Sequence, residues 1–139
     1  YANVRPCRTF PGVHSRFEDV DVVVIRDVTE DLYAGVEAMA GTPEAEAIIA
    51  KVREVLPKAR IADGAAITIR AISEEASLRL AEYAFQYAER NNRRKVTAVH
   101  KANVMKATDG VFLSACREVA EKHRLVPLGG LAGVSLSFC

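Results

Sequence analysis

The fold class of this chain is decided by residues 96–106, which read VTAVHKANVMK. The run at residues 96–100 is rich in β-branched residues and predicts a short strand. The helix predicted after it has an apolar stripe at helical spacing. That stripe is formed by Phe112, Cys116, Val119 and Ala120. A strand followed by an amphipathic helix is the unit from which α/β domains are built.

The same alternation of helices and strands extends upstream. Thr42 and Pro43 predict the start of a helix that ends at Pro57, because Thr is a good N-cap and Pro is tolerated at the first helical position. Ser73 begins the longest predicted helix, which Asn91 ends. Strands are predicted around Val4 and at residues 20–25, 33–38 and 65–72. Residues 8–18 and 27–32 are predicted loops. We therefore expect the α/β class.

The composition limits the kinds of partner that we expect this chain to bind. The chain has 139 residues, the size of one domain, and a net charge of +1, which provides no field for nucleic acid or an anionic membrane. No apolar run has the length of a membrane span. Cys7, Cys116 and Cys139 show no metal-ligand spacing and predict reduced thiols, hence a cytoplasmic location. Because the sequence opens as if within a strand and without Met, we expect a fragment.

Two arginines are candidates for binding carboxylates. Arg5 and Arg26 each lie near the end of a predicted strand. A guanidinium group forms two parallel hydrogen bonds to a carboxylate, so neighbouring arginines suit a substrate with several carboxylates. Position alone leaves ordinary surface or salt-bridged arginines as an open alternative.

Two further residues are candidates for proton transfer. Lys101 follows a predicted strand, where burial or cationic neighbours would lower its pKa and make it a base. Tyr33 has a phenol that could protonate a developing carbanion. A surface lysine and a packed tyrosine remain the alternatives. We expect His100 to point away from Lys101, as a residue of the core or one that supports the site without acting as a ligand.

The neighbouring acidic residues are Asp27, Glu30 and Asp31. They predict a solvated loop better than a metal site, because their spacing is not a known ligand pattern. The sequence contains no GxGxxG motif or phosphate-binding loop, so a dinucleotide site is not visible in it.

Three stretches together resemble the β-decarboxylating dehydrogenases, the family of isocitrate and 3-isopropylmalate dehydrogenases. They are YANVRP at residues 1–6, VIRDVTEDLYAGVE at residues 24–37 and VHKANVMK at residues 99–106. The TEDLYAG and VHKANVMK forms are similar to those of isocitrate dehydrogenase. The resemblance implies the small α/β domain of that fold at residues 1–124, with a clasp insertion at about residues 34–72. Residues 125–139 form an apolar tail that the resemblance leaves unassigned.

The resemblance also implies roles for individual residues. Arg5 and Arg26 match substrate-binding arginines, and Asn103 matches an asparagine near substrate and nicotinamide. Tyr33 matches the tyrosine that protonates the enol. Lys101 matches the lysine that takes part in proton transfer at the substrate hydroxyl, in the partner subunit's site.

The reaction implied is oxidation and decarboxylation of isocitrate or a similar 2-hydroxy acid by NAD or NADP with Mg²⁺ or Mn²⁺, in a homodimer formed through the clasp. The resemblance places the metal-binding aspartates, the substrate-binding serine loop and most nucleotide contacts outside the matched stretches, so the chain is expected to be inactive alone.

The chain departs from the family pattern at Asp27 and Val28, where the family usually has Glu and Asn. Two rival interpretations therefore stay open. One is a non-catalytic dimerisation or regulatory module of the same family. The other is a related dehydrogenase acting on isopropylmalate, homoisocitrate or tartrate.

Overall fold

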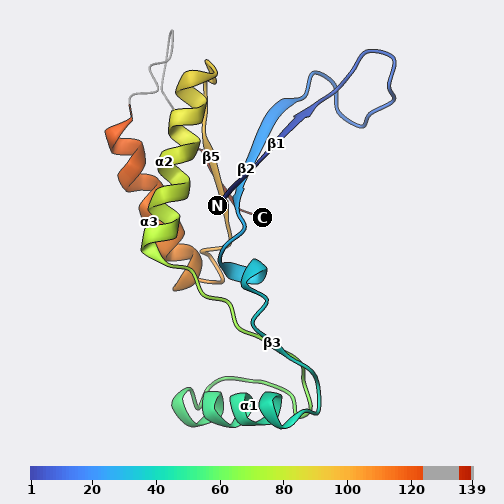
Figure 1. Cartoon of the computed structure of the whole chain (residues 1–139), viewed down its shortest axis with the longest axis vertical. Helices are drawn as coiled ribbons and strands as arrows, with labels where there is room; N and C mark the ends of the chain where they lie inside the picture. The colour runs from blue at the N-terminus through green and yellow to red at the C-terminus, as the bar shows by residue number, and fades with distance from the viewer. Residues whose placement is uncertain (124–134, 139) are drawn as a thin grey trace. The chain divides into compact units, whose positions relative to one another are not determined.

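The computed structural model describes residues 1–123 and 135–138, and the chain divides into two compact units. The first unit combines Tyr1–Glu30 with Ile72–Cys139, and the second is Asp31–Ala71. Helices and strands alternate along the chain, which confirms the predicted α/β class (Figure 1).

Two helices and a strand form the core of the first unit. Helix α2, Glu74–Arg90, packs against α3, Thr108–Lys122, and α3 packs on strand β5, Thr97–His100 (Figure 1). The buried side chains that form the cluster are Ala81, Phe85, Ala98, Cys116 and Val119. Phe112 and Ala120 pack against this cluster as the predicted stripe requires. Burial raises the pKa of the Cys116 thiol to about 11, so it stays protonated at neutral pH.

Helix α2 starts and ends where its sequence predicts. The Ser73 side chain accepts a hydrogen bond from the Ala76 amide at 3.2 Å, and the helix ends at Arg90 with Asn91 as its C-cap. These signals were readable in the sequence because both caps act within a few residues of the helix end.

Strand β1, Ala2–Arg8, and strand β2, Asp21–Asp27, form an antiparallel ribbon (Figure 1). Both strands run beyond their predicted bounds. Pro6 does not end β1, because a two-stranded ribbon has an open edge at which the missing N–H needs no partner. The ribbon lies on α2, where Arg79 stacks over the Tyr1 ring at 4.6 Å.

The second unit contains one α-helix and three short elements. They are the 3₁₀ helix η1, Asp31–Ala34, strand β3, Glu37–Ala38, helix α1, Pro43–Val55, and strand β4, Ile67–Thr68. Thr42 caps α1 as predicted, since its hydroxyl accepts a hydrogen bond from the Ala45 amide at 3.4 Å. Ala45 and Ile49 are the buried apolar residues of this helix.

The two strands predicted in the second unit are much shorter than expected. Tyr33 lies in η1 instead of a strand, and Gly35 follows with a φ of 63°. β3 and β4 pair over only two residues each. A run with strand propensity extends as a strand only where a partner supplies a regular series of hydrogen bonds. Next to β3 and β4, one further bond, from the Ile69 amide to the Val36 carbonyl at 2.9 Å, continues the pairing.

Much of the predicted apolar tail, at residues 125–134 and 139, lies outside the described residues. Strand β6, Ser135–Phe138, belongs to that tail and pairs in parallel with β5. Among the described residues, no helix is both long and apolar enough to cross a membrane.

Candidate active site

The strand register brings Arg5 and Arg26 onto one face of the ribbon. Arg5 lies opposite Val24, and Arg26 lies opposite Asn3. Residues that lie opposite each other, and residues two apart on one strand, share a face, so the two arginines are diagonal neighbours. The expectation that both stand near strand ends is wrong for Arg5, which lies in the middle of β1, because β1 continues to Arg8.

The face with the arginines is the exposed face of the ribbon. Val22 and Val24 on this face are 50% and 41% exposed, whereas Val4, Val23 and Ile25 on the opposite face are partly buried. The two guanidinium groups are therefore carried on a surface that a ligand can reach, above a ribbon whose other face is partly covered.

Asn3 is a polar residue of this face that the sequence analysis missed. Its Oδ1 accepts a hydrogen bond from Arg5 Nε at 2.9 Å, and its position is directly across from Arg26. The spacing of two residues between Asn3 and Arg5 was the available signal, but it points to a shared face only once a strand is assigned.

Lys101 lies at the end of β5, in a turn that leads to α3. The Lys101 amide donates to Asp109 Oδ2 at 2.5 Å, and the Lys101 carbonyl accepts from the amides of Val104 and Met105 at 2.9 and 2.8 Å. The Ala102 amide donates to His100 Nδ1 at 3.1 Å. These bonds fix the backbone from which the lysine side chain projects.

Burial agrees with the predicted alternation around this lysine. His100 is 5% exposed and lies in the core, while Lys101 is partly exposed. Asp109 is also buried, at 6% exposed, and was missed in the sequence. The sequence feature that could have indicated Asp109 is its place in the first turn of a helix, where the helix dipole favours a carboxylate. Asn103, in the same turn, is exposed.

The carboxylates of the predicted acidic loop are engaged within the chain. Asp27 Oδ1 accepts from the amide and the hydroxyl of Thr29 at 2.6 and 2.5 Å. Burial acts to raise the pKa of Asp27, but the hydrogen bonds from Thr29 outweigh it and hold that pKa below its ordinary value. Glu30 accepts two hydrogen bonds from Ser73. Asp31 forms a two-point ion pair with Arg70.

These contacts give the acidic loop a structural role instead of the purely solvated one predicted. Across residues 1–123 and 135–138, no group of three or more His, Cys, Asp or Glu side chains is arranged to hold a metal ion. The described carboxylates therefore do not fit the divalent metal that the resemblance implies.

Tyr33 belongs to the second unit, within η1, and is 56% exposed. The first unit carries the other four predicted site residues, Arg5, Arg26, Lys101 and Asn103. The 3₁₀ turn around Tyr33 starts at Asp31, whose amide donates to the Ala71 carbonyl at 3.1 Å and whose carboxylate pairs with Arg70. The backbone that carries Tyr33 is thus held at its start.

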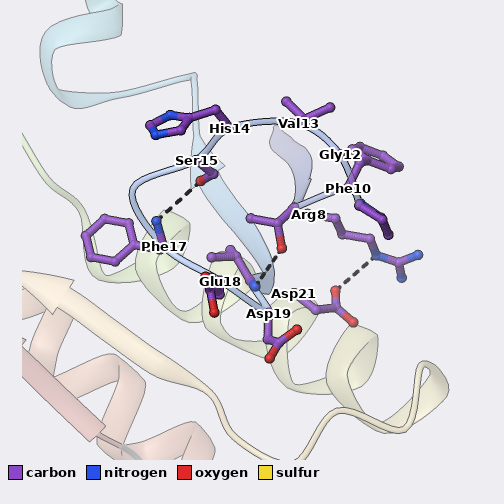
Figure 2. Close-up of a pocket in the computed structure, with 13 residues that line it drawn as sticks. Arg8, Phe10, Gly12, Val13, His14, Ser15, Phe17, Glu18, Asp19 and Asp21 are labelled. Atoms are coloured by element: carbon purple, nitrogen blue, oxygen red, sulfur yellow. Dashed lines mark hydrogen bonds and ion pairs between the residues drawn. The ribbon is translucent and has the colours of Figure 1, made fainter.

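A cavity of about 850 Å³ lies within the loop that joins β1 to β2 (Figure 2). Its lining includes Arg8, His14, Phe17 and Asp21, and Arg8 Nε donates to Asp21 Oδ1 at 3.1 Å. Neither Arg5 nor Arg26 lines it. We assign no chemistry to this cavity, because an open loop surrounds it and its Arg8 and Asp21 side chains are paired with each other.

Comparison with known proteins shows the family to which this chain belongs. Residues 1–135 match the family model for isocitrate/isopropylmalate dehydrogenase. The chain belongs to this family of oxidoreductases, and its fold matches a part of a solved isocitrate dehydrogenase structure.

Individual relatives agree with this assignment. The chain is 48% identical over 122 residues to a probable mitochondrial NAD isocitrate dehydrogenase alpha subunit of Drosophila melanogaster, covering 88% of this chain and 27% of that protein. It is 42% identical over 123 residues to the chloroplastic 3-isopropylmalate dehydrogenase of Solanum tuberosum, covering 88% and 29%. The crystal structure of isocitrate dehydrogenase from Methylococcus capsulatus superposes with a TM-score of 0.71 at 35% identity, over 100% of this chain and 34% of that one.

Two consequences follow from these comparisons. The chain spans a little over a quarter of the length of the curated relatives, so it corresponds to a segment of such an enzyme. The predicted cytoplasmic location is wrong: similar proteins from Drosophila melanogaster, Arabidopsis thaliana and Bos taurus are mitochondrial. Reduced thiols did not discriminate between these compartments, since absence of a disulfide pattern excludes only an oxidising one.

Proposed function

We propose that this chain is the substrate-binding and proton-transfer segment of an NAD-dependent isocitrate dehydrogenase. The observation that carries the proposal is the diagonal pair of Arg5 and Arg26 on the exposed ribbon face, within a chain whose family membership is clear. Two guanidinium groups on adjacent strands suit a substrate with several carboxylates, since each can hold one carboxylate at two points.

The other residues divide the remaining chemistry. Lys101 serves proton transfer at the substrate hydroxyl as hydride leaves for the nicotinamide. Tyr33 donates a proton to carbon after carbon dioxide leaves, and Asn103 lies near substrate and nicotinamide. The hydrogen bonds that fix the backbone around Lys101 support its role in proton transfer, because a proton-transfer group must lie at a defined distance from its target.

The cofactor proposed is NAD, because the similar isocitrate dehydrogenases from Drosophila melanogaster and Bos taurus are NAD enzymes. A divalent Mg²⁺ or Mn²⁺ would supply Lewis acidity at the developing carbonyl. Since the described residues of this chain do not fit a metal, we assign its ligands to other parts of the complete enzyme.

Two alternatives rest on specific relatives. The similarity to the Solanum tuberosum enzyme favours 3-isopropylmalate as the second candidate substrate. A regulatory role has support from a mitochondrial NAD isocitrate dehydrogenase regulatory subunit of Dictyostelium discoideum, which is 42% identical over 123 residues. The change to Asp27 and Val28 would fit such a role.

The proposal is tested in the complete polypeptide that contains this segment. NAD reduction is measured with isocitrate and with 3-isopropylmalate, in the presence of Mn²⁺. We expect turnover with isocitrate and, in Arg26→Gln, a KM for isocitrate raised about tenfold or more, because a charge-assisted contact to substrate is lost.

The matched control is Arg94→Gln, which removes an exposed guanidinium from the loop before β5. It should leave both kinetic constants unchanged. Turnover with 3-isopropylmalate alone would transfer the proposal to that substrate. A polypeptide that turns over neither substrate, yet activates a catalytic partner, would replace the proposal with the regulatory role.

A further inference from the structure

The polar contact between Asn3 and Arg5 bears on how the ribbon binds its ligand. Asn3 Oδ1 accepts the hydrogen bond from Arg5 Nε at 2.9 Å. A guanidinium can offer a carboxylate either its Nε side, with one terminal nitrogen, or its end, with both terminal nitrogens. A contact at Nε takes the first of these away and leaves the end of the fork for a ligand.

The ribbon register gives this contact a second consequence. Asn3 is directly opposite Arg26 and two residues before Arg5 on β1, so its position adjoins both arginine positions on one face. Val24 occupies the matching position opposite Arg5 and provides no polar atom. Asn3 is thus a polar neighbour of both arginine positions, and its side chain accepts a hydrogen bond from Arg5.

We propose that Asn3 is a positioning residue that fixes Arg5 for end-on binding of a substrate carboxylate. The inference rests on the proposed function of Arg5 and deepens it. Without the Asn3 oxygen, the Arg5 side chain rotates freely among its rotamers on the exposed face, and ordering it costs free energy each time a ligand binds. Asn3 orders it in advance without touching the reacting atoms.

The test uses the complete enzyme with two single variants and their double variant. Asn3→Leu keeps the branched shape of the side chain and removes the acceptor. Arg5→Lys keeps the positive charge and removes both the Nε–H donor and the fork. We expect Asn3→Leu to raise the KM for isocitrate about five- to tenfold, the size of the cost of ordering one long side chain on binding, with kcat and the KM for NAD little changed.

The double variant separates positioning from direct contact. If Asn3 acts through Arg5, adding Asn3→Leu to Arg5→Lys raises the KM no further, because the group that Asn3 positions is gone. Independent, multiplying effects would overturn the inference and indicate that Asn3 meets the substrate itself. A fall in kcat and thermal stability without a selective change in the KM for isocitrate would also overturn it, in favour of a structural role.

Val22, on the same ribbon face, provides a control position. Val22→Thr changes an exposed residue of the same ribbon face without removing an acceptor, and it should leave the KM unchanged. An unchanged KM in Arg5→Lys would count against the proposed function of Arg5. A raised KM in Arg5→Lys with none in Asn3→Leu would overturn the positioning role alone.

Discussion

The carboxylate of Glu30 and the helix N-cap Ser73, 43 residues apart in the chain, are joined by two hydrogen bonds. The Ser73 amide donates to Glu30 Oε2 at 2.8 Å, and the Ser73 hydroxyl donates to Glu30 Oε1 at 2.6 Å. The same hydroxyl accepts from the Ala76 amide. One serine therefore caps α2 and holds the loop that follows β2.

We expect Ser73→Ala to lower the free energy of unfolding by about 1–2 kcal/mol, since it removes a helix cap and leaves a partly buried carboxylate with fewer partners. Urea denaturation of the chain measures this change. Ser114→Ala, on the exposed face of α3, is the matched control and should change stability by no more than a few tenths. Equal stability of the two variants would refute the double role of Ser73.

The His123 ring makes the contact between α2 and the end of α3 dependent on pH. Its two nitrogens lie 2.9 Å from Glu89 Oε1 and Glu82 Oε1, and its ring stacks on Phe85. A neutral imidazole has only one N–H, so only the protonated ring can donate to both carboxylates. Accordingly the pKa of His123 is raised, first by the bond to Glu89 and also by Glu82, against an opposing effect of burial.

The sign of the pH dependence follows from these shifts. A raised folded-state pKa for His123 gives stability that is full below its ordinary value of 6.5 and lost as pH rises through the folded value. The pKa of Glu82 is lowered, by bonds from Gln86 and then His123, so its contribution is lost as pH falls below 4.5.

We therefore expect the wild-type chain to be more stable, relative to His123→Gln, at about pH 6 than at about pH 8.5. Urea denaturation of both proteins at the two pH values provides the measurement, and comparison with the variant cancels titrations elsewhere. A difference in stability that stays constant across this range would show that the pKa of His123 is the same in the folded and the unfolded chain.

Lys101 and Tyr33 are predicted to act at opposite ends of the reaction. In the complete enzyme, Lys101→Met and Tyr33→Phe should each lower kcat about a hundredfold to ten-thousandfold with small changes in KM, as loss of proton transfer does. Steady-state kinetics with isocitrate and NAD measure both constants. Lys95→Met and Tyr87→Phe are matched controls outside the proposed site. A raised KM with unchanged kcat in either site variant would reassign that residue to binding.

The resemblance places Lys101 in the partner subunit's site. If that is so, mixing the Lys101→Met and Tyr33→Phe proteins should restore part of the activity, because one site of each mixed dimer keeps both groups. Native mass spectrometry must first show that subunits exchange. Mixed dimers as inactive as their parents would return Lys101 to the site of its own protomer.

We expect the 139-residue chain by itself to show no isocitrate-dependent reduction of NAD or NADP with Mn²⁺, since it corresponds to little more than a quarter of its relatives' length. A spectrophotometric assay of the pure chain at high concentration makes the check, with the complete enzyme as the positive control. Clear turnover by the chain would contradict the proposal that it is a segment.

Residues 34–72, the proposed clasp, should supply most contacts of a two-fold dimer. Apolar residues of the second unit are well exposed, among them Val36 at 49%, Met39 at 76% and Ile69 at 44%. Light scattering should report a dimer that Met39→Lys weakens, whereas Val13→Lys, at an exposed position outside the clasp, should not weaken it. A monomer at high concentration would show that the clasp assignment is wrong. Association only with a related but different chain would indicate a heteromer instead of a homodimer.

The sequence by itself determined the helices, the class and the family. The Ser73 and Thr42 hydroxyls each accept a hydrogen bond from an amide three residues further on. The apolar residues of α3 recur at helical spacing. Each of these patterns lies within a short stretch of sequence, so it can be recognised without the tertiary structure. The motifs around Arg26 and Lys101 likewise indicate a dehydrogenase from the sequence alone.

Only the tertiary structure decided where the strands end and which side chains meet. The pairing of β1 with β2 places Asn3 directly opposite Arg26, and the pairing of β3 with β4 stops after two residues. Asp109 accepts a hydrogen bond from the Lys101 amide, 8 residues away in the chain. Glu30 accepts one from the Ser73 amide, 43 residues away. A strand takes its hydrogen bonds from a distant partner, so its register depends on packing that no local pattern contains.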